Sequence, residues 1–111
     1  MQVSIAMATY NGAKYLQEQL DSFTRQTRQP DELVVCDDGS NDETMVILEH
    51  FTAAAPFQVK IHRNATNLGC TRNFEKAISL CAGDYVFLSD QDDGWHSAKI
   101  STMVTGFESS P

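Results

Sequence analysis

Short apolar runs alternate along the chain with segments of helical spacing. Four such runs predict β-strands, at positions 3–8, 33–36, 57–62 and 85–88. The third run alternates apolar and polar residues, which indicates a half-buried strand near an edge of the sheet. The fourth run is apolar throughout, which is typical of a strand in the middle of a parallel sheet.

Each predicted strand is followed by a segment whose apolar residues recur with the period of a helix. In the segment 13–27, Leu16, Leu20 and Phe23 fall on one face. Comparable stripes lie between the second and third strands, over 74–81, and over 100–107. The order of elements is therefore β-α-β-α-β-α-β-α.

Two helix ends carry recognisable signals. Ser40 and Glu43 have the spacing of a capping box, which predicts the start of the second helix. Gly83 follows the third stripe and is predicted to be the first residue after the end of that helix.

The alternation of strands and helices determines the expected fold class. We expect an α/β, Rossmann-like three-layer α/β/α fold with a mostly parallel sheet, because right-handed crossovers put helices on both faces. All strands then end at one edge, where such sheets bind ligands. Polar clusters follow three of the strands, at 9–11, 37–38 and 90–93. The sequence therefore predicts one site built from residues as distant as Thr9 and Asp90.

Composition limits the possible partners and the compartment. The 111 residues suffice for one domain, and 8 Lys and Arg against 15 Asp and Glu give a net charge of −7. An acidic chain of this kind is not expected to bind nucleic acid or anionic membranes. No apolar run is long enough to span a membrane, and the start lacks the pattern of a signal peptide. Three cysteines without paired spacing suggest reduced, mostly buried thiols and a cytoplasmic location.

The acidic cluster after the fourth strand predicts a metal site. Carboxylates gathered at one edge repel one another by on the order of a few kcal/mol per close pair. Mg²⁺ or Mn²⁺ would relieve this repulsion and would let an acidic site hold an anionic diphosphate. We expect this chemistry from Asp90, Asp92 and Asp93, whereas Asp42 and Glu43 fit the first turn of a helix. The alternative is that all these acids cap helices and solubilise loops.

Arg72 and Trp95 each allow two interpretations. Arg72 stands near the start of the third helix, where it suits a phosphate or a base carbonyl, or else forms a surface ion pair with Glu75 or Glu18. Trp95 follows the acidic cluster, and its more frequent role is packing in a core or as an aromatic lid.

Four motifs together resemble the inverting glycosyltransferases of family 2, which have the GT-A fold. They occur in the order of the family and span nearly the whole chain, at 3–11 (VSIAMATYN), 35–40 (VCDDGS), 67–73 (NLGCTRN) and 90–95 (DQDDGW). The last motif, a D-x-D followed by Asp and Trp, is similar to a rhamnosyltransferase-like branch of the family.

The resemblance implies a donor-binding role for eight residues. Thr9 and Tyr10 would flank the base, with Tyr10 stacking nearby, and Asn11 would belong to the same nucleotide-sugar site. Asp38 would accept a hydrogen bond from the imide N–H of the base. Arg72 would contact the base or diphosphate, and Asp90 would hold the ribose. Asp92 would bind Mg²⁺ or Mn²⁺ against the diphosphate, with Asp93 as a second metal ligand.

The resemblance also implies the substrates of the reaction and the location of the catalytic base. The donor would be a nucleoside-diphosphate sugar of UDP or dTDP type, and the acceptor of the full-length protein a glycan or a lipid-linked molecule. The catalytic base of the family lies in an acceptor-binding half, and no matching candidate precedes Pro111. We therefore expect one truncated, donor-binding domain over 1–111, which binds without turnover and self-associates through surfaces that truncation exposes.

Three other classes of protein share part of this pattern. A non-catalytic nucleotide-binding or assembly module would have the same fold and would bind without transfer. A receiver or phosphatase domain would need a nucleophilic Asp after the appropriate strand, and here the first strand ends in 9–11 (TYN). A dinucleotide dehydrogenase is disfavoured because no G-x-G-x-x-G follows the first strand.

Overall fold

The computed structural model of the chain describes residues 2–90 and 94–109. The strands are β1 (Val3–Thr9), β2 (Glu32–Asp37), β3 (Gln58–Arg63) and β4 (Tyr85–Asp90). The helices are α1 (Ala13–Thr24), α2 (Thr44–Ala54), α3 (Cys70–Ser79) and α4 (Lys99–Ser109). Every strand and helix predicted from the sequence is therefore present, in the predicted order.

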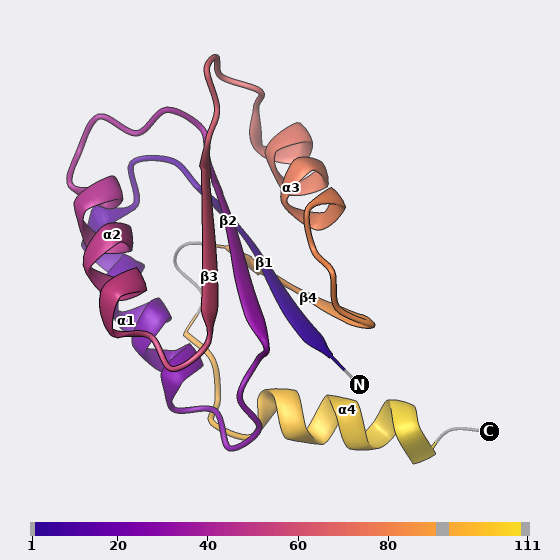
Figure 1. Ribbon diagram of the computed structural model, residues 1–111. Helices are drawn as coiled ribbons and strands as arrows, with labels where there is room; N and C mark the ends of the chain where they lie inside the picture. The colour runs from indigo at the N-terminus through magenta and orange to yellow at the C-terminus, as the bar shows by residue number, and fades with distance from the viewer. Residues whose placement is uncertain (1, 91–93, 110–111) are drawn as a thin grey trace.

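The four strands form one parallel sheet in the order β3-β2-β1-β4 (Figure 1). The chain builds outward from β1 to β3 and then returns to place β4 on the other side of β1. Strand order therefore reverses at β1, and ligands bind such sheets at this kind of switch point. The structure confirms the Rossmann-like α/β class.

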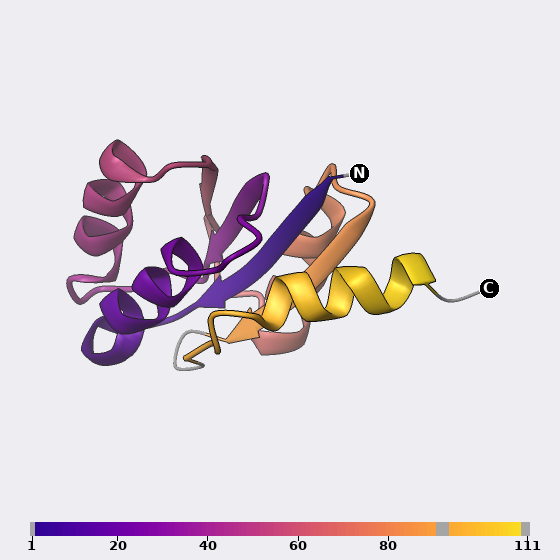
Figure 2. The same cartoon turned by 90° about the horizontal axis from the view of Figure 1, so that it is seen from below.

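Alternate residues of β1 pack on opposite faces of the sheet. Val3, Ile5 and Met7 join the larger core cluster, together with buried side chains of α1, α2 and α4. Ala6 faces the other way and packs with Cys36 and Ala77 beneath α3. Figure 2 shows the sheet between these layers, which confirms the predicted helices on both faces.

The fourth strand lies at an edge of the sheet, where the sequence predicted a central position. Tyr85 and Phe87 pack toward the larger core, but Val86 and Leu88 on the other face are 37% and 54% exposed. An uninterrupted apolar run therefore did not mean burial on both faces here. The prediction for β3 is confirmed, because it is an edge strand with alternating exposure.

Both helix-end signals were wrong in detail. The residue before α2 is Glu43, which makes no side-chain capping bond, and the hydroxyl of Ser40 instead donates to Asp37. Helix α3 ends at Ser79, and Gly83 lies beyond it against Ser4 of β1. A Cβ at Gly83 would meet the Ser4 Oγ at 2.5 Å, so this position needs glycine for a close approach.

Residues 95–100 are anchored on α1 and on the turn that follows it. Trp95 is buried with its ring 4.8 Å from that of Phe23 and 6.0 Å from that of Phe87, which confirms a packing role. The buried amide of Gln26 donates to the carbonyl of His96 at 2.7 Å and accepts from the N–H of Ile100 at 3.1 Å. Among the residues described, no helix has the length and apolarity needed to cross a membrane.

Candidate functional site

A cavity of about 400 Å³ opens at the carboxyl end of the sheet, beside the strand-order switch. Its wall combines the end of β1, the turn after β2 and the start of α3. The lining residues are Ala8, Thr9, Tyr10, Asp38, Asn67, Gly69, Cys70 and Asn73. Three residues predicted for the site, Thr9, Tyr10 and Asp38, therefore border one cavity.

Asp38 is the buried carboxylate of this cavity, with only 6% of its surface exposed. Its Oδ1 accepts from the N–H of Leu68 at 2.7 Å and from Nδ2 of Asn64 at 2.9 Å. Its Oδ2 accepts from the N–H of Gly69 at 3.0 Å. The carboxylate thus organises the loop that leads into α3 while it faces the cavity.

These hydrogen bonds determine the charge state of Asp38. Burial by itself would raise the pKa of this carboxyl group, but the N–H groups of Leu68 and Gly69 and the amides of Asn64 and Asn67 outweigh it. The net pKa lies below its usual range, so Asp38 is an anion at neutral pH. Its described hydrogen-bond donors are all amides, so these contacts leave its negative charge uncompensated.

The neighbouring Asp37 has a structural role. It is fully buried, and its Oδ1 accepts from the hydroxyls of Thr9 at 2.7 Å and Ser40 at 2.5 Å. Its Oδ2 accepts from the N–H of Ser40 at 2.8 Å. Asp37 therefore ties the loop after β1 to the loop after β2 and fixes one wall of the cavity.

Asn11 joins the same two loops from outside the cavity lining. Its φ of 47° is left-handed, a conformation that Asn tolerates. Its N–H donates to the Ser40 Oγ at 2.8 Å, and its Oδ1 accepts from the N–H of Asn41 at 2.9 Å. The structure thus gives Asn11 a loop-fastening position, while Tyr10 beside it is about half exposed at the mouth of the cavity.

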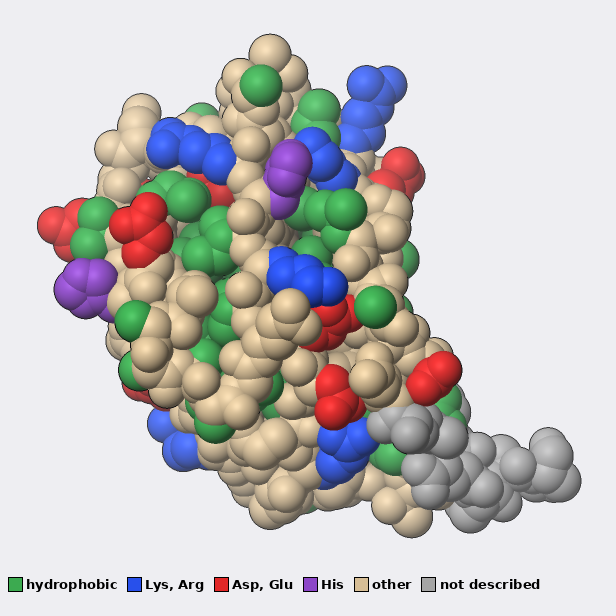
Figure 3. Space-filling model, in the orientation of Figure 1, with side chains coloured by type: hydrophobic (Ala, Val, Ile, Leu, Met, Phe, Trp, Pro, Cys, Tyr) green, Lys and Arg blue, Asp and Glu red, His purple; other side chains and the backbone are tan. Residues whose placement is uncertain are grey.

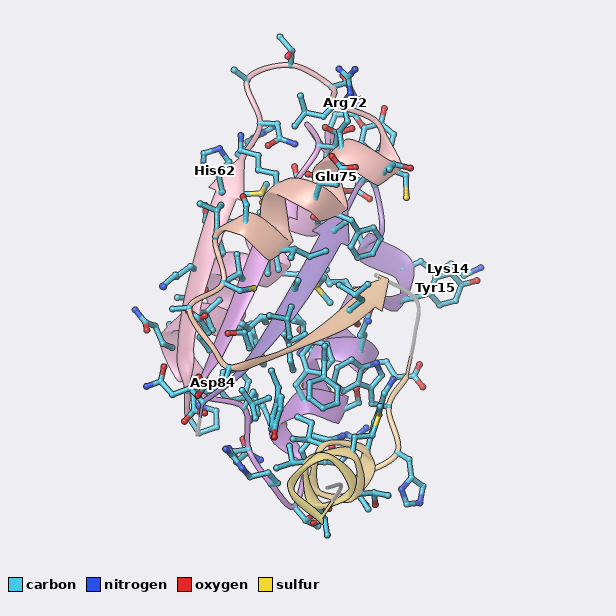
Figure 4. The ribbon with its side chains drawn as sticks, turned by 90° about the vertical axis from the view of Figure 1, so that its right-hand side faces the viewer. Lys14, Tyr15, His62, Arg72, Glu75 and Asp84 are labelled. Carbon is cyan, nitrogen blue, oxygen red and sulfur yellow. The ribbon has the colours of Figure 1, made fainter. Side chains whose placement is uncertain are left out.

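Arg72 lies near the cavity without lining it. It is exposed on α3, and Figure 4 shows it at the end of the molecule where that helix begins. On the face of the molecule drawn in Figure 3, acidic and basic side chains are interspersed with apolar surface.

A set of amides that no sequence motif singles out holds the floor of the cavity. Asn64 donates to Asn73 as well as to Asp38, and Asn73 donates to the carbonyl of Cys36 at 2.8 Å. The Asn67 amide donates to the backbone carbonyl of Asp38 at 2.9 Å. The only signal in the sequence is the recurrence of Asn over residues 64–73, which a surface turn would explain equally well.

The acidic cluster is described only at its first residue. Asp90 ends β4 and pairs with Ala8, so its backbone lies beside the cavity. Asp92 and Asp93 lie outside the described residues. Within the described part of the chain, no group of three or more His, Cys, Asp or Glu side chains is arranged to hold a metal.

The fold and the position of the cavity define a Rossmann-like α/β domain with a ligand site at the reversal of strand order. The family model for glycosyl transferase family 2 matches residues 4–111. The chain belongs to this family.

Two known proteins resemble the chain over most of its length. The dTDP-rhamnosyl transferase RfbG of Shigella flexneri is 35% identical over 102 residues, which cover 88% of this chain and 35% of RfbG. The structure of S. aureus TarS 1–349 in complex with UDP has a TM-score of 0.88 at 28% identity, over 97% of this chain and 32% of that one.

A third likeness supports the fold alone. The mannosyltransferase PcManGT from Pyrobaculum calidifontis, solved with GDP-Man and Mn²⁺, has a TM-score of 0.85 at 23% identity, over 99% of this chain and 33% of that one. The chain spans about a third of the length of the curated relatives it matches.

Proposed function

We propose that this chain binds the nucleoside diphosphate of a sugar donor for an inverting glycosyltransferase. The observation that carries the proposal is the buried, uncompensated carboxylate of Asp38 in a cavity at the strand-order switch. The full-length protein would transfer the sugar to a hydroxyl of a glycan or lipid-linked acceptor in surface polysaccharide synthesis. The names of relatives such as RfbG support this reaction class.

The base of the nucleotide would enter the cavity. Asp38 would accept a hydrogen bond from its imide N–H, and Tyr10 would lie against its ring beside Thr9 and Asn11. Uracil and thymine carry such an N–H, so the donor would be of UDP or dTDP type. TarS, to which the chain is 28% identical, has been solved with UDP and with UDP-GlcNAc.

The diphosphate would lie toward the end of β4. Asp90 would hold the ribose, and Asp92 with Asp93 would hold Mg²⁺ or Mn²⁺. A divalent cation there supplies charge neutralisation for the leaving diphosphate. Arg72, close by on α3, would reach the diphosphate or the base.

Binding and transfer are separable activities in this proposal. The 111 residues would bind the donor without turnover, because the base that activates the acceptor lies elsewhere in the family. In isolation the chain would therefore bind nucleotide without transferring sugar, which is also what the alternative function, a non-catalytic nucleotide-binding or assembly module, would do. Measuring sugar transfer and nucleotide binding side by side distinguishes the two, and transfer by the purified chain would overturn the no-turnover proposal.

A thermal-shift screen tests the binding proposal. UDP, dTDP and GDP are each added with and without Mn²⁺ to the wild type, to Asp92→Ala and to Glu49→Ala, which removes an exposed acid of α2. Ligand at ten times its Kd stabilises the folded state by about 1.4 kcal/mol, which raises Tm by several degrees. We expect this shift for UDP or dTDP with Mn²⁺ in the wild type and Glu49→Ala. A shift that survives unchanged in Asp92→Ala would contradict the metal assignment.

Location and self-association remain predictions. We expect a cytoplasmic protein, and we expect copies to associate through the edge strand β4 and its exposed Val86 and Leu88. Size-exclusion chromatography with light scattering across a concentration series tests the second expectation. A strictly monomeric species at the highest concentration would contradict it.

A further inference from the structure

We propose that Asn64 is a positioning residue for base recognition, an inference that rests on the proposed function. Asn64 would orient the two polar side chains, Asp38 and Asn73, that the cavity presents to the edge of a base. It does not line the cavity itself, so it would act only through these two neighbours.

The backbone of Asn64 is fixed by the sheet. Asn64 directly follows β3, and its N–H donates to the carbonyl of Asp37 at 2.8 Å, which continues the pairing of Arg63 with Asp37. Only 6% of the residue is exposed. The side chain is therefore held between the carboxyl end of β2 and helix α3.

The side-chain nitrogen of Asn64 connects both lining residues. Its Nδ2 donates to Oδ1 of Asp38 at 2.9 Å and to Oδ1 of Asn73 at 2.8 Å. Because an amide nitrogen carries two N–H groups, these bonds use its whole donor capacity. Asp38 and Asn73 are thus held close together by one atom.

This arrangement determines which groups remain for a ligand. A carboxylate has about four acceptor positions, and the hydrogen bonds from Asn64, Leu68 and Gly69 occupy three of those of Asp38, whereas the Asn67 amide donates to its backbone carbonyl. Asn73 turns its oxygen to Asn64 and uses one of its two N–H groups on Cys36, so its second N–H remains. The cavity therefore offers one acceptor and one donor side by side.

An imide edge complements that pair. In uracil or thymine, an N–H stands next to a carbonyl, so the N–H would donate to Asp38 while the carbonyl accepts from Asn73. If the Asn73 amide were reversed, its oxygen would face the carbonyl of the base and repel it. Asn64 and the carbonyl of Cys36 together prevent the reversal, because the first requires an oxygen of Asn73 at its contact and the second requires an N–H.

Lys76 fixes the orientation of Asn64 in turn. Its Nζ donates to Oδ1 of Asn64 at 3.2 Å, so the oxygen of this amide faces the cation and the nitrogen faces Asp38. An aspartate at position 64 would satisfy Lys76 but would have no N–H for either lining residue.

The experiment compares UDP with N3-methyl-UDP, which lacks the imide N–H, in the presence of Mg²⁺. Affinities are measured by calorimetry for the wild type, Asn64→Leu, Lys76→Met and a control, Ser4→Ala. Like Asn64, Ser4 is a buried, hydrogen-bonded residue, but it lies at the opposite end of the sheet, so its variant controls for lost stability. Lys76→Met removes the cation and keeps the apolar part of this partly buried side chain. It therefore tests the same role if Asn64→Leu fails to fold.

We expect the wild type and Ser4→Ala to prefer UDP by at least about tenfold, since a hydrogen bond to a charged group contributes at this level. The preference should fall to about threefold or less in Asn64→Leu and to an intermediate value in Lys76→Met. A preference that stays at the wild-type level in both variants overturns the role of Asn64 and leaves the proposed function standing.

Amide hydrogen exchange of the ligand-free chain supplies a second readout. The N–H groups of Leu68 and Gly69 should exchange faster in Asn64→Leu than in Ser4→Ala, and equal exchange overturns the positioning role. If the wild type does not bind UDP at all, the proposed function fails. Faster exchange would then mark Asn64 as a structural residue alone, which also overturns its part in base recognition.

Discussion

The two ends of β2 carry two buried carboxylates with opposite surroundings. At the amino end, Glu32 pairs with Lys60 at 2.8 Å and accepts from the Ser4 hydroxyl at 2.5 Å and from the N–H of Ala82 at 2.6 Å. At the carboxyl end, Asp38 has amide donors and borders a cavity. The polar groups of one end are used internally, while the other end keeps an acceptor for a ligand.

The pKa values alone do not separate these two ends. Burial would raise the pKa of Glu32, but Lys60, Ser4 and Ala82 outweigh it, and the net pKa is lowered as it is for Asp38. The difference is the partner that stabilises the charge. A cation neutralises Glu32 and makes it a clamp between strands, whereas dipoles leave the charge of Asp38 uncompensated. A buried carboxylate stabilised only by dipoles at a cavity is therefore the better marker of a binding site.

The largest expected effect comes from Asp38→Ala. We expect its affinity for UDP with Mg²⁺ to fall by about 100-fold, because the charged acceptor is lost and the N–H groups of Leu68 and Gly69 lose their partner. Calorimetry measures the change, with Glu32→Gln as the matched variant at the other end of the strand. If the affinity for UDP fell equally in Asp38→Ala and Glu32→Gln, the two ends of β2 would not differ in function.

The second effect concerns Gly83, which belongs to the amino end. A Cβ there would lie 2.5 Å from Oγ and 2.8 Å from the backbone N of Ser4, so Gly83→Ala should destabilise the fold by about 2 kcal/mol. Urea unfolding checks this value. In Gly106→Ala the new Cβ would meet nothing within 4 Å inside α4, so that control should be neutral or slightly stabilising. If Gly83→Ala were as stable as the wild type, the close approach of Gly83 to Ser4 would be contradicted.

A smaller loss is expected for Glu32→Gln. The substitution removes the ion pair with Lys60, whose side chain is 43% exposed and therefore screened by solvent, and keeps most of the shape. We expect about 1 kcal/mol less stability in urea and an unchanged affinity for UDP. A change in affinity beyond about threefold would mean that the clamp reaches the cavity.

The smallest effect is a difference in pH dependence. Both carboxyl groups have folded-state pKa values below their usual 3.8 (Asp38) and 4.5 (Glu32), so the unfolded chain binds protons at higher pH than the folded chain. Their stabilisation is complete above those usual values and is lost as pH falls through the lowered ones. Urea unfolding from pH 7 to 3 should show a shallower loss for Glu32→Gln than for the wild type. An unchanged slope would contradict the lowered pKa.

The sequence predicted the sheet because its signals are local. The apolar runs and helical stripes gave every element, and the turn residues after β1, β2 and β4 gave the edge where the cavity lies. The position of β4 was missed because strand order determines which faces are covered, and an apolar run reports only the kind of residue. Gly83 was misassigned for a similar reason, since its neighbour Ser4 is distant in sequence.

The site was predictable only in part. Thr9, Tyr10 and Asp38 were predicted to lie together because parallel strands bring their ends together, and they border one cavity. Asn64 was passed over because its importance comes from contacts with Asp38, Asn73 and Lys76, which three different elements supply. Spacing along the chain gives no indication of such a junction, and an Asn in a loop has an ordinary explanation as a turn residue.

A ¹H–¹⁵N NMR titration of the chain with UDP and Mg²⁺ tests the central claim most directly. If the nucleotide binds at the carboxyl end of the sheet, the amide signals of Tyr10, Leu68 and Gly69 should move together and saturate, while those of Ala82 and Gly83 at the amino end stay in place. Signals that move only at the amino end, or no saturable movement at Leu68 and Gly69, would contradict the account.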